Sequence, residues 1–392
     1  MARKICVLTT AHPPSDVRIF HKECKSIARA GYDVTLIASA DEDCIRDGIR
    51  LLRLPRWKNR LDRMLRGSFA IYKKAREINA DIYHFHDPEL IPAALLLRLA
   101  GKKVVYDIHE DLPRTISYKP YIPGFLKGAI SQTAELVEDW AGGRFSAVVA
   151  ATPTIGRRFR RVSDNVAVVN NYPKIEEIEP PGGSANEKRE ARGAILLYVG
   201  MRITRARGAV EMVQAVGLLQ SKLRARLRLV GAWDSAELPQ SLSNLPGWSR
   251  TEFVGPLDRS GVANELRRAT VGLVLLHPEP NYVESQPVKL FEYMCAGIPV
   301  IVSDFPVCRE IVRKAGCGIL VNPLEPDEIA RAMEYLLTHP AEAEEMGRRG
   351  FQAVHENYNW ANEEKILVQM YERLFSHDPA YQPSLADTRC AP

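Results

Sequence analysis

Short apolar runs alternate with helix-periodic segments from the beginning of the chain. Residues 4–10 form an apolar run, Ile19, Cys24 and Ile27 follow on one helical face, and residues 34–38 form a second run. Short apolar runs indicate buried strands, and Ser15 stands where a helix is capped. Strand, helix and strand within about 38 residues predict a βαβ unit of a parallel sheet.

The same alternation continues through both halves of the chain. In the first half we expect strands at 49–54, 81–85, 103–108, 147–150 and 166–169, and helices at 56–76, 88–100, 128–141 and 154–161. In the second half we expect strands at 194–199, 226–230, 251–254, 271–276, 299–303 and 317–321, and helices at 208–220, 258–268, 287–296, 306–314, 326–338, 341–355 and 360–375. This pattern predicts an α/β protein with doubly wound parallel sheets.

A break rich in proline and glycine divides the chain at Pro180-Pro181-Gly182-Gly183-Ser184. Such a segment between two α/β patterns is typical of an interdomain linker. We therefore expect two Rossmann-like domains that face each other across a cleft. The predicted segments are a first domain at 1–172, a linker at 173–193, a second domain at 194–357, a helix at 358–376 and a frayed tail at 377–392.

Composition adds limits to this interpretation. The chain has 392 residues, of which 46% are hydrophobic and 26% charged, as in an ordinary soluble globular protein. A net charge of +5 gives little reason to expect nucleic acid as a partner, since an anionic lipid or a nucleotide suits it equally. The seven cysteines are scattered without a Cys-x-x-Cys pair, so no disulfide framework or zinc site is predicted. We find no signal peptide or membrane span and expect a cytoplasmic protein.

The stretch 281–304 carries the clearest candidate chemistry. It reads as a polar loop, a short helix with Pro287 in its first position and Gly297 after its end, and a buried strand. Glu284 lies before the helix and Glu292 inside it. A helix N-terminus suits a phosphate, and carboxylates accept hydrogen bonds from sugar hydroxyls. The layout therefore indicates a diphosphate that joins two sugars.

A second candidate phosphate site is the segment 200–208, which follows the first strand of the second domain. It contains Arg202, Arg205 and Arg207 and leads into a helix. Arginine binds phosphate through two hydrogen bonds and keeps its charge when partly buried. The alternative is that these arginines simply cover the domain surface.

Two segments of the first domain suggest a lipid or acceptor surface. The stretch 56–76 has eight basic residues against the single acid Asp62, interleaved with apolar ones. Basic amphipathic helices bind anionic membranes, although a solvated helix face has the same pattern. The aromatic loop 118–125 is a candidate to touch lipid or an acceptor.

With both motifs in hand, the chain resembles the glycosyltransferases of family 4, which have the GT-B fold. The family carries a Gly-Arg…Lys-Gly loop, matched by Gly200 to Gly208, and a Glu-x(7)-Glu motif, matched by Glu284 to Glu292. In the loop Met201 is an additional residue, and Arg207 stands in place of the family's lysine. The resemblance covers nearly the whole chain and implies a C-terminal helix that crosses back to the first domain.

The resemblance implies roles for individual residues on the donor side. Glu292 would hold the ribose, Arg202 and Arg207 would neutralise the leaving diphosphate, and Glu284 would contact the donor sugar near the reacting carbon. His109 would face that sugar from the first domain. The remaining donor-binding candidates lie around the helix N-terminus: Gln286, Pro287, Val288, Lys289 and Leu290, with backbone N–H groups of the last three.

The acceptor side is predicted in the first domain, at Asp16, Arg18, His86 and Tyr118. The resemblance implies a retaining enzyme in which the leaving phosphate oxygen accepts the proton of the acceptor, so catalysis rests on positioning and electrostatic stabilisation. The donor would be a UDP- or GDP-linked sugar, with no further cofactor. The acceptor would be a glycan or a lipid-linked sugar, and the 56–76 segment would place the enzyme at the inner face of the cell membrane.

Two patterns resemble metal sites, and we expect no metal at either. Asp41-Glu42-Asp43 has an Asp-x-Asp pattern, but it lies in an early loop of a different fold class. His84, His86 and His109 provide three imidazoles, a known ligand set. His84 and His86 share a strand face while His109 follows the next strand, which favours core or cleft histidines.

Two other functions remain open. A sugar-nucleotide epimerase of the same fold would need acid–base carboxylates, which Glu110, Asp111 and Glu284 provide, and would turn over donor without an acceptor. A non-catalytic subunit that binds nucleotide sugars would show binding without transfer.

Overall fold

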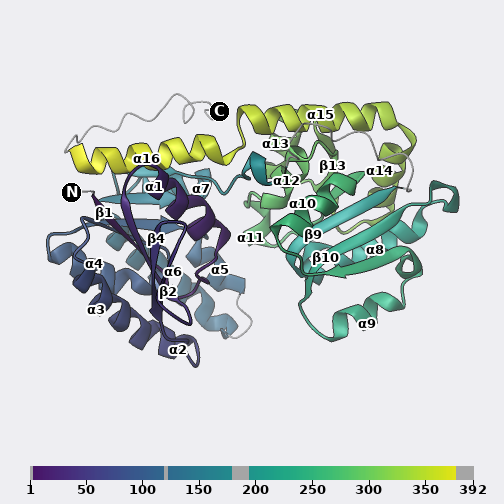
Figure 1. Cartoon of the computed structure of the whole chain (residues 1–392). Helices are drawn as coiled ribbons and strands as arrows, with labels where there is room; N and C mark the ends of the chain where they lie inside the picture. The colour runs from purple at the N-terminus through teal and green to yellow at the C-terminus, as the bar shows by residue number, and fades with distance from the viewer. Residues whose placement is uncertain (1–2, 119–121, 179–193, 377–392) are drawn as a thin grey trace. The chain divides into compact units, whose positions relative to one another are not determined.

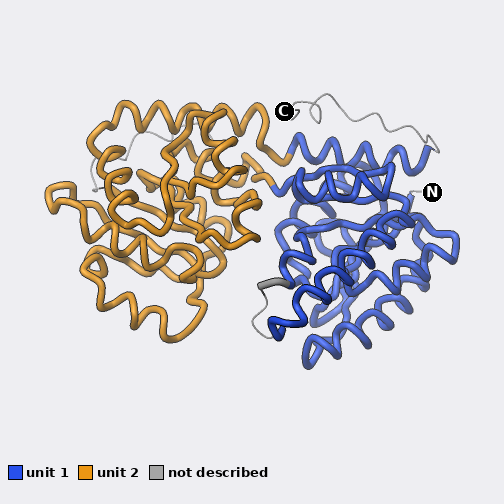
Figure 2. The backbone as a smooth tube through the Cα atoms, turned by 180° about the vertical axis from the view of Figure 1, so that it is seen from behind, with its two compact units in different colours: residues 1–171, 361–392 blue, residues 172–360 orange. Residues whose placement is uncertain are grey.

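The computed structural model describes residues 3–118, 122–178 and 194–376. The chain forms two compact units, unit 1 with residues 1–171 and 361–392, and unit 2 with residues 172–360 (Figure 2). Each unit contains one sheet with helices packed against it (Figure 1). The two doubly wound sheets confirm the predicted α/β class.

The sheet of unit 1 has the strand order β3-β4-β2-β1-β5-β6-β7-β8, and neighbouring strands are parallel except for β3 and β4. The strands are β1 (Lys4–Leu8), β2 (Asp33–Ser39), β3 (Cys44–Arg46), β4 (Ile49–Leu54), β5 (Ile82–Phe85), β6 (Lys103–Ile108), β7 (Ala147–Ala150) and β8 (Val166–Val168). The central strands are nearly all apolar because helices cover both faces of a parallel sheet.

The helices of unit 1 are α1 (Lys25–Arg29), α2 (Arg60–Asp62), α3 (Ser68–Ile78), α4 (Ile91–Leu99), α5 (Leu112–Tyr118), α6 (Gly124–Gly142), α7 (Pro153–Phe159) and the C-terminal α16 (Trp360–Ser376). Two π-helical segments (Val17–Cys24 and Arg63–Gly67) precede α1 and α3, and a 3₁₀ turn (Pro88–Leu90) precedes α4.

Unit 2 has the strand order β11-β10-β9-β12-β13-β14, with all neighbours parallel. Its strands are β9 (Ile195–Ile203), β10 (Arg226–Trp233), β11 (Thr251–Gly255), β12 (Val271–Val274), β13 (Val300–Ser303) and β14 (Gly318–Val321). Its helices are α8 (Ala209–Leu218), α9 (Glu237–Ser243), α10 (Arg259–Arg268), α11 (Pro280–Val283), α12 (Val288–Cys295), α13 (Pro306–Ala315), α14 (Pro326–Thr338) and α15 (Pro340–Glu356). Four 3₁₀ turns (Ile175–Glu177, Arg205–Arg207, Ser221–Leu223 and Pro246–Arg250) connect them.

The C-terminal helix α16 belongs to unit 1 from Ala361 onward, as predicted. The hydroxyl of Tyr371 contacts the ring of His84 in β5, and the Glu363 carboxylate accepts the backbone N–H of Asn170 at 2.6 Å. The last helix therefore completes the packing of the first domain although it follows the second in sequence.

Several local features differ from the expectations. Asp16, and not Ser15, caps the first helix, because its Oδ1 accepts the N–H groups of Arg18 and Ile19. Pro287 is the N-cap of α12 and not its first helical residue. The short elements β3, α5 and α9 were not predicted, since their few apolar residues give no clear period. Residues 179–193 of the predicted linker and the tail 377–392 lie outside the described residues, whereas Ile178 is buried in unit 2.

Candidate active-site residues

The predicted donor-binding residues of unit 2 lie at the topological switch point of its sheet. The chain runs from β9 through β10 to β11 on one side and then returns to β12 on the other side of β9. Loops after β9 and β12 therefore leave the carboxyl ends of two adjacent strands, where open α/β sheets bind ligands. The first loop carries Arg207, and the second leads through Glu284 into α12.

The segment 200–208 begins as strand and not as loop, in contrast to the prediction. Val199 pairs with Val230 and Arg202 with Ala232, so β9 has one more residue than β10 over this interval. Such a β-bulge absorbs an additional residue without breaking the ladder. The turn then closes at Gly208, where φ is +74° and an added Cβ would lie 2.3 Å from the carbonyl oxygen of Leu275. Only glycine fits there.

The two predicted phosphate-binding arginines have different surroundings. The Arg202 side chain is 59% exposed and lies 3.5 Å from Asp234. Arg207 is partly buried, with its Nε 3.4 Å from the hydroxyl of Tyr282. Arg207 is therefore the more firmly oriented of the two.

Lys289 is buried in the first turn of α12 and points toward Arg207 and β9. Its Nζ lies 3.7 Å from the centroid of the Tyr198 ring and has no hydrogen-bond partner among the described residues. Burial lowers the pKa of Lys289 well below its usual range, and the charge of Arg207 lowers it further. The charge of Glu292 opposes this shift, but no described carboxylate forms an ion pair with the amine. A buried amine beside an arginine and without an ion-pair partner is a site that an anionic ligand would satisfy.

Glu292 is buried and already has a cationic partner that the sequence did not reveal. Its Oε1 lies 2.7 Å from Arg259 Nη1, and Arg259 Nη2 lies 3.0 Å from Glu177. Arg259 starts α10, about thirty residues away in sequence, so no local pattern connects it to Glu292. Arg259 holds one carboxylate oxygen of Glu292 and fixes the direction of the other.

The predicted backbone donors at the start of α12 are reduced to two. The N–H of Leu290 donates to the carbonyl of Pro287 at 2.9 Å, so it is not available to a phosphate, in contrast to the prediction. Val288 and Lys289 stay as the predicted donors. Glu284 is the C-cap that follows α11, and the buried Gln286 Oε1 has no hydrogen-bond partner in the described part of the chain.

In unit 1 the switch point lies between β1 and β5, and Asp87 joins the two loops there. Asp87 Oδ2 accepts the N–H groups of Thr10 and Ala11 at 2.6 and 3.1 Å and the hydroxyl of Thr9 at 2.9 Å. With the Thr10 hydroxyl at 3.3 Å, four donors on one carboxylate oxygen fix the loop after β1. The order of strands thus brings Asp87 into contact with a loop that lies 76 to 78 positions earlier in the sequence.

His12 and His109 face each other beside this loop, with ring centroids 5.1 Å apart. Burial lowers the pKa of His12, but the hydrogen bond with Asp16 and the charge of Asp87 outweigh it, so the net pKa is raised. Burial lowers the pKa of His109 to about 3, so its ring is neutral near pH 7. The pair combines an imidazole whose pKa is raised with one that is neutral, and only His109 was singled out from the sequence.

Arg18 and His86 were predicted on the acceptor side, but both are buried in unit 1. Arg18 is 4% exposed and pairs with Asp107 at 3.1 Å and Glu23 at 2.8 Å. His86 is 3% exposed, and its Nδ1 lies 3.0 Å from His109 Nε2. Because both side chains are buried, neither is open to an acceptor. The prediction was wrong because helix periodicity does not show when a charged residue such as Arg18 points into the core. Asp16 is partly exposed, and the side chain of Tyr118 lies outside the described residues.

The acids of the Asp41-Glu42-Asp43 segment bind to arginine residues of the chain itself. Asp41 pairs with Arg56 at 2.9 Å, and Asp43 accepts the N–H of Arg53 at 2.6 Å. Both acids thus serve the local structure around β4.

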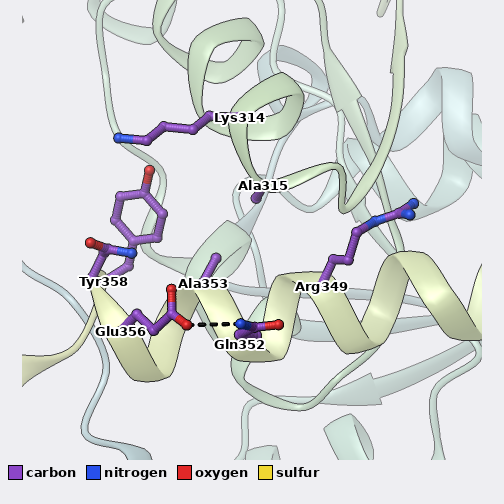
Figure 3. A pocket seen from close by; sticks show the side chains of 8 residues that line it. Lys314, Ala315, Arg349, Gln352, Ala353, Glu356 and Tyr358 are labelled. Atoms are coloured by element: carbon purple, nitrogen blue, oxygen red, sulfur yellow. Dashed lines mark hydrogen bonds between the residues drawn. The ribbon is translucent and has the colours of Figure 1, made fainter.

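A pocket on unit 2 has no part in either group of site residues. It lies between the end of α13 and α15, with Lys314 and Arg349 at its sides (Figure 3). Arg349 Nε donates to the carbonyl of Gly316 at 2.9 Å, and Gln352 donates to Glu356 at 2.8 Å. The polar residues Arg349 and Gln352 of this pocket thus already have hydrogen-bond partners within the chain.

Comparison with known proteins identifies the family of each half of the chain. A family model described as Glycosyltransferase Family 4 matches residues 17–172, and one described as Glycosyl transferases group 1 matches residues 184–353. The phosphatidyl-myo-inositol mannosyltransferase of Mycobacterium leprae is 24% identical over 298 residues, which are 74% of this chain and 73% of that protein.

Solved structures share the fold at low identity. Sucrose-phosphate synthase from Thermosynechococcus elongatus gives a TM-score of 0.78 at 21% identity, over 96% of this chain and 100% of that one. Anabaena HepE in complex with UDP-glucose gives 0.71 at 17% identity, over 95% and 99%. With a matched family domain in each half and this fold throughout, the chain belongs to the group 1, family 4 glycosyltransferases of the GT-B fold.

Proposed function

We propose that the chain is a retaining hexosyltransferase that moves a sugar from a UDP- or GDP-linked donor to a glycan or lipid-linked acceptor. The observation that carries this proposal is the buried Lys289 beside Arg207, at the switch point of unit 2 and without an ion-pair partner among the described residues. The diphosphate of a nucleotide sugar supplies that partner. The complex of HepE with UDP-glucose supports the donor class, and the lipid substrate in the mannosyltransferase's name supports the acceptor class.

In the proposed donor complex, Arg207, Lys289 and the N–H groups of Val288 and Lys289 surround the diphosphate. Glu292 uses the carboxylate oxygen that Arg259 leaves free to accept the ribose hydroxyls, and Glu284 accepts hydroxyls of the transferred sugar. Arg202 is exposed and reaches the outer phosphate.

The proposed chemistry needs no dedicated base. The bond between the sugar and the diphosphate breaks, and the acceptor hydroxyl attacks the same face of the sugar while its proton passes to the leaving phosphate oxygen. Arg207 and Lys289 stabilise the charge that develops on that oxygen. They take the place of a metal at the diphosphate, so we propose a metal-independent transfer step. His109 contacts substrate through its exposed edge in unit 1.

We further propose that the enzyme works at the inner face of the cell membrane. Leu61, Leu65 and Phe69 follow one another at four-residue spacing and are 65%, 67% and 71% exposed. Arg66 beside them is 77% exposed. Apolar and basic side chains on one helical face suit an anionic lipid surface. No helix within the described ranges is both long and apolar enough to cross a bilayer.

A binding panel followed by a transfer assay tests the proposal. A nucleoside diphosphate at 100 times its dissociation constant should stabilise the protein by about 2.7 kcal/mol, visible as a higher melting temperature. Lys289→Met should weaken this shift, whereas Lys314→Met, at the unrelated pocket of Figure 3, should not. No shift with any UDP or GDP compound would contradict the donor class.

The donor identified in this way is then incubated with lipid and glycan acceptors, and the anomeric configuration of the product is determined by NMR. Retention and an unchanged rate on addition of Mg²⁺ or Mn²⁺ are expected. An inverted product would contradict the retaining mechanism. Donor turnover without an acceptor would favour an epimerase, and binding without any turnover a non-catalytic subunit.

A further inference from the structure

Four buried side chains of unit 1 bring metal-ligating atoms to one point. They are Glu23 of the π-helix, His84 and His86 at the end of β5, and Asp107 of β6, all at most 3% exposed. One oxygen or nitrogen from each lies within 4.8 Å of the others. His84 and His86 share a strand face and stack with centroids 4.7 Å apart. The parallel register of β5 and β6 places Asp107 beside them.

The separations suit a small ion with four ligands. His84 Nε2 lies 3.4 Å from Asp107 Oδ2, and His86 Nε2 lies 3.7 Å from Glu23 Oε2. Two ligands of a tetrahedral ion with bonds of about 2.1 Å are about 3.4 Å apart. A small contraction of the cluster would complete that geometry.

Both histidines place Nε2 beside a carboxylate of the cluster, although His86 Nδ1 also lies 3.7 Å from Asp107 Oδ2. His84 Nδ1 contacts the hydroxyl of Tyr371, and His86 Nδ1 lies 3.0 Å from His109 Nε2. Neither Nε2 atom has a hydrogen-bond partner in the described part of the chain. Unpartnered buried nitrogens are costly, and a ring that is held by its outer N–H with its inner nitrogen free is the arrangement of a metal-bound histidine.

The charges of the cluster also call for a cation. Arg18 Nε lies 2.8 Å from Glu23 Oε1, and Arg18 Nη2 lies 3.1 Å from Asp107 Oδ1. Arg18 thus approaches oxygens other than the two that face the histidines, although its Nη2 is also 3.2 Å from Asp107 Oδ2. One arginine cannot neutralise two buried carboxylates. The remaining charge requires a proton or a metal ion.

We propose that Glu23, His84, His86 and Asp107 bind one divalent first-row transition metal ion in the core of unit 1. Two imidazoles with two carboxylates suit zinc, iron or manganese, whereas calcium and magnesium take oxygen ligands. All four ligands come from the protein and are buried, as in a structural site. The ion touches no substrate and is separate from the metal-independent transfer step.

The proposed ion also makes His86 a positioning residue for His109. With its Nε2 on the metal, His86 carries its proton on Nδ1 and donates it to His109 Nε2. His109 then carries its own proton on Nδ1, so one tautomer of this ring is fixed.

The metal content of the full chain tests this proposal. The protein is expressed without a histidine tag, dialysed and analysed by mass spectrometry for metals. About one equivalent of a transition metal per chain is expected. Glu23→Gln and His84→Gln should each reduce it at least tenfold, while His339→Gln, at an exposed histidine, should leave it unchanged.

Because core variants can fail to fold, wild-type protein provides a second measurement. The chain is unfolded in denaturant with a chelator and refolded with or without equimolar Zn²⁺ or Co²⁺. A bound ion should raise the melting temperature, and cobalt should give the visible absorption of a four-coordinate site. Native protein without metal that also takes up none on refolding would overturn the proposal, and a shared proton would then balance the cluster.

Discussion

Lys289 and Tyr198 form a cation–π contact inside unit 2, with the lysine nitrogen 3.7 Å from the ring centroid. The tyrosine hydroxyl donates to the carbonyl of Arg202 at 2.7 Å, so the ring is fixed by the strand that carries the arginine segment. Gly200 leaves room for the amine, because a Cβ there would lie 3.2 Å from Nζ. The lysine is thus held beside the proposed diphosphate, and no residue that the structure describes forms an ion pair with it.

The stability of the protein should depend on pH through Lys289. Burial lowers the pKa of this lysine in the folded protein well below its unfolded value near 10.5. Between these two values the unfolded chain binds one more proton, so stability rises with pH by about 1.4 kcal/mol per unit. Below the folded pKa both states are protonated and this slope disappears. Lys289→Met should lack the slope.

Urea unfolding at several pH values between 7 and 10 measures this difference. Lys314→Met is the control, since Lys314 is exposed and its removal should leave the slope of the wild type. Parallel curves for wild type and Lys289→Met would show that the buried amine stays protonated.

Gly208→Ala should destabilise unit 2 and weaken nucleotide binding. The new Cβ would meet the Leu275 carbonyl at 2.3 Å in a backbone conformation with φ of +74°. Strain and clash together should cost about 2–4 kcal/mol, and the turn that carries Arg207 should shift. Gly255 has a similar φ of +86°, but only the ring of Phe253 lies near, at 4.0 Å. Gly255→Ala should therefore cost about 1 kcal/mol.

Thermal unfolding and nucleotide titration of the two variants separate these effects. Equal destabilisation would indicate that backbone conformation alone matters. Unchanged nucleotide affinity in Gly208→Ala would show that the turn does not position Arg207 for a ligand.

Much of this fold is predictable from sequence, because helix and strand periods are local properties. Helix α14 begins and ends at the predicted residues 326 and 338, and α12 and β13 differ from prediction by one residue. The Glu284–Glu292 motif is equally local. By contrast, Arg18 contacts Asp107, 89 residues later in the chain, and hydropathy alone places such an arginine at the surface. Arg259 and Asp87 were missed as partners for the same reason.

The exposed apolar face of 61–69 should control binding to anionic vesicles. A triple variant with glutamine at Leu61, Leu65 and Phe69 removes three side chains that are more than 60% exposed, so vesicle binding should fall at least tenfold with no loss of stability. Arg66→Glu should add a salt-dependent loss. Arg63 is a poor choice for such a test, because it pairs with Glu89 at 2.6 Å and its loss would disturb unit 1.

Vesicle flotation with and without phosphatidylserine measures this binding. Leu99→Gln is the matched control, because Leu99 is 84% exposed at the end of another helix of the same unit. If the triple variant floats like the wild type, the face is an ordinary solvated helix surface.

Arg259→Met should lower donor affinity although Arg259 is not predicted to touch the donor. Without this partner Glu292 is left buried with an unpaired charge, and its carboxylate is no longer held in one orientation for the ribose hydroxyls. The ion pair is partly exposed, and its loss should cost about 1–2 kcal/mol of stability. Glu177→Gln removes the outer half of the network and should cost less than about 1 kcal/mol, because Glu292 keeps Arg259.

Isothermal titration with the nucleoside diphosphate found in the binding panel compares the variants. A loss in Glu177→Gln as large as in Arg259→Met would mean that the network acts by holding the 173–178 segment and not by orienting Glu292.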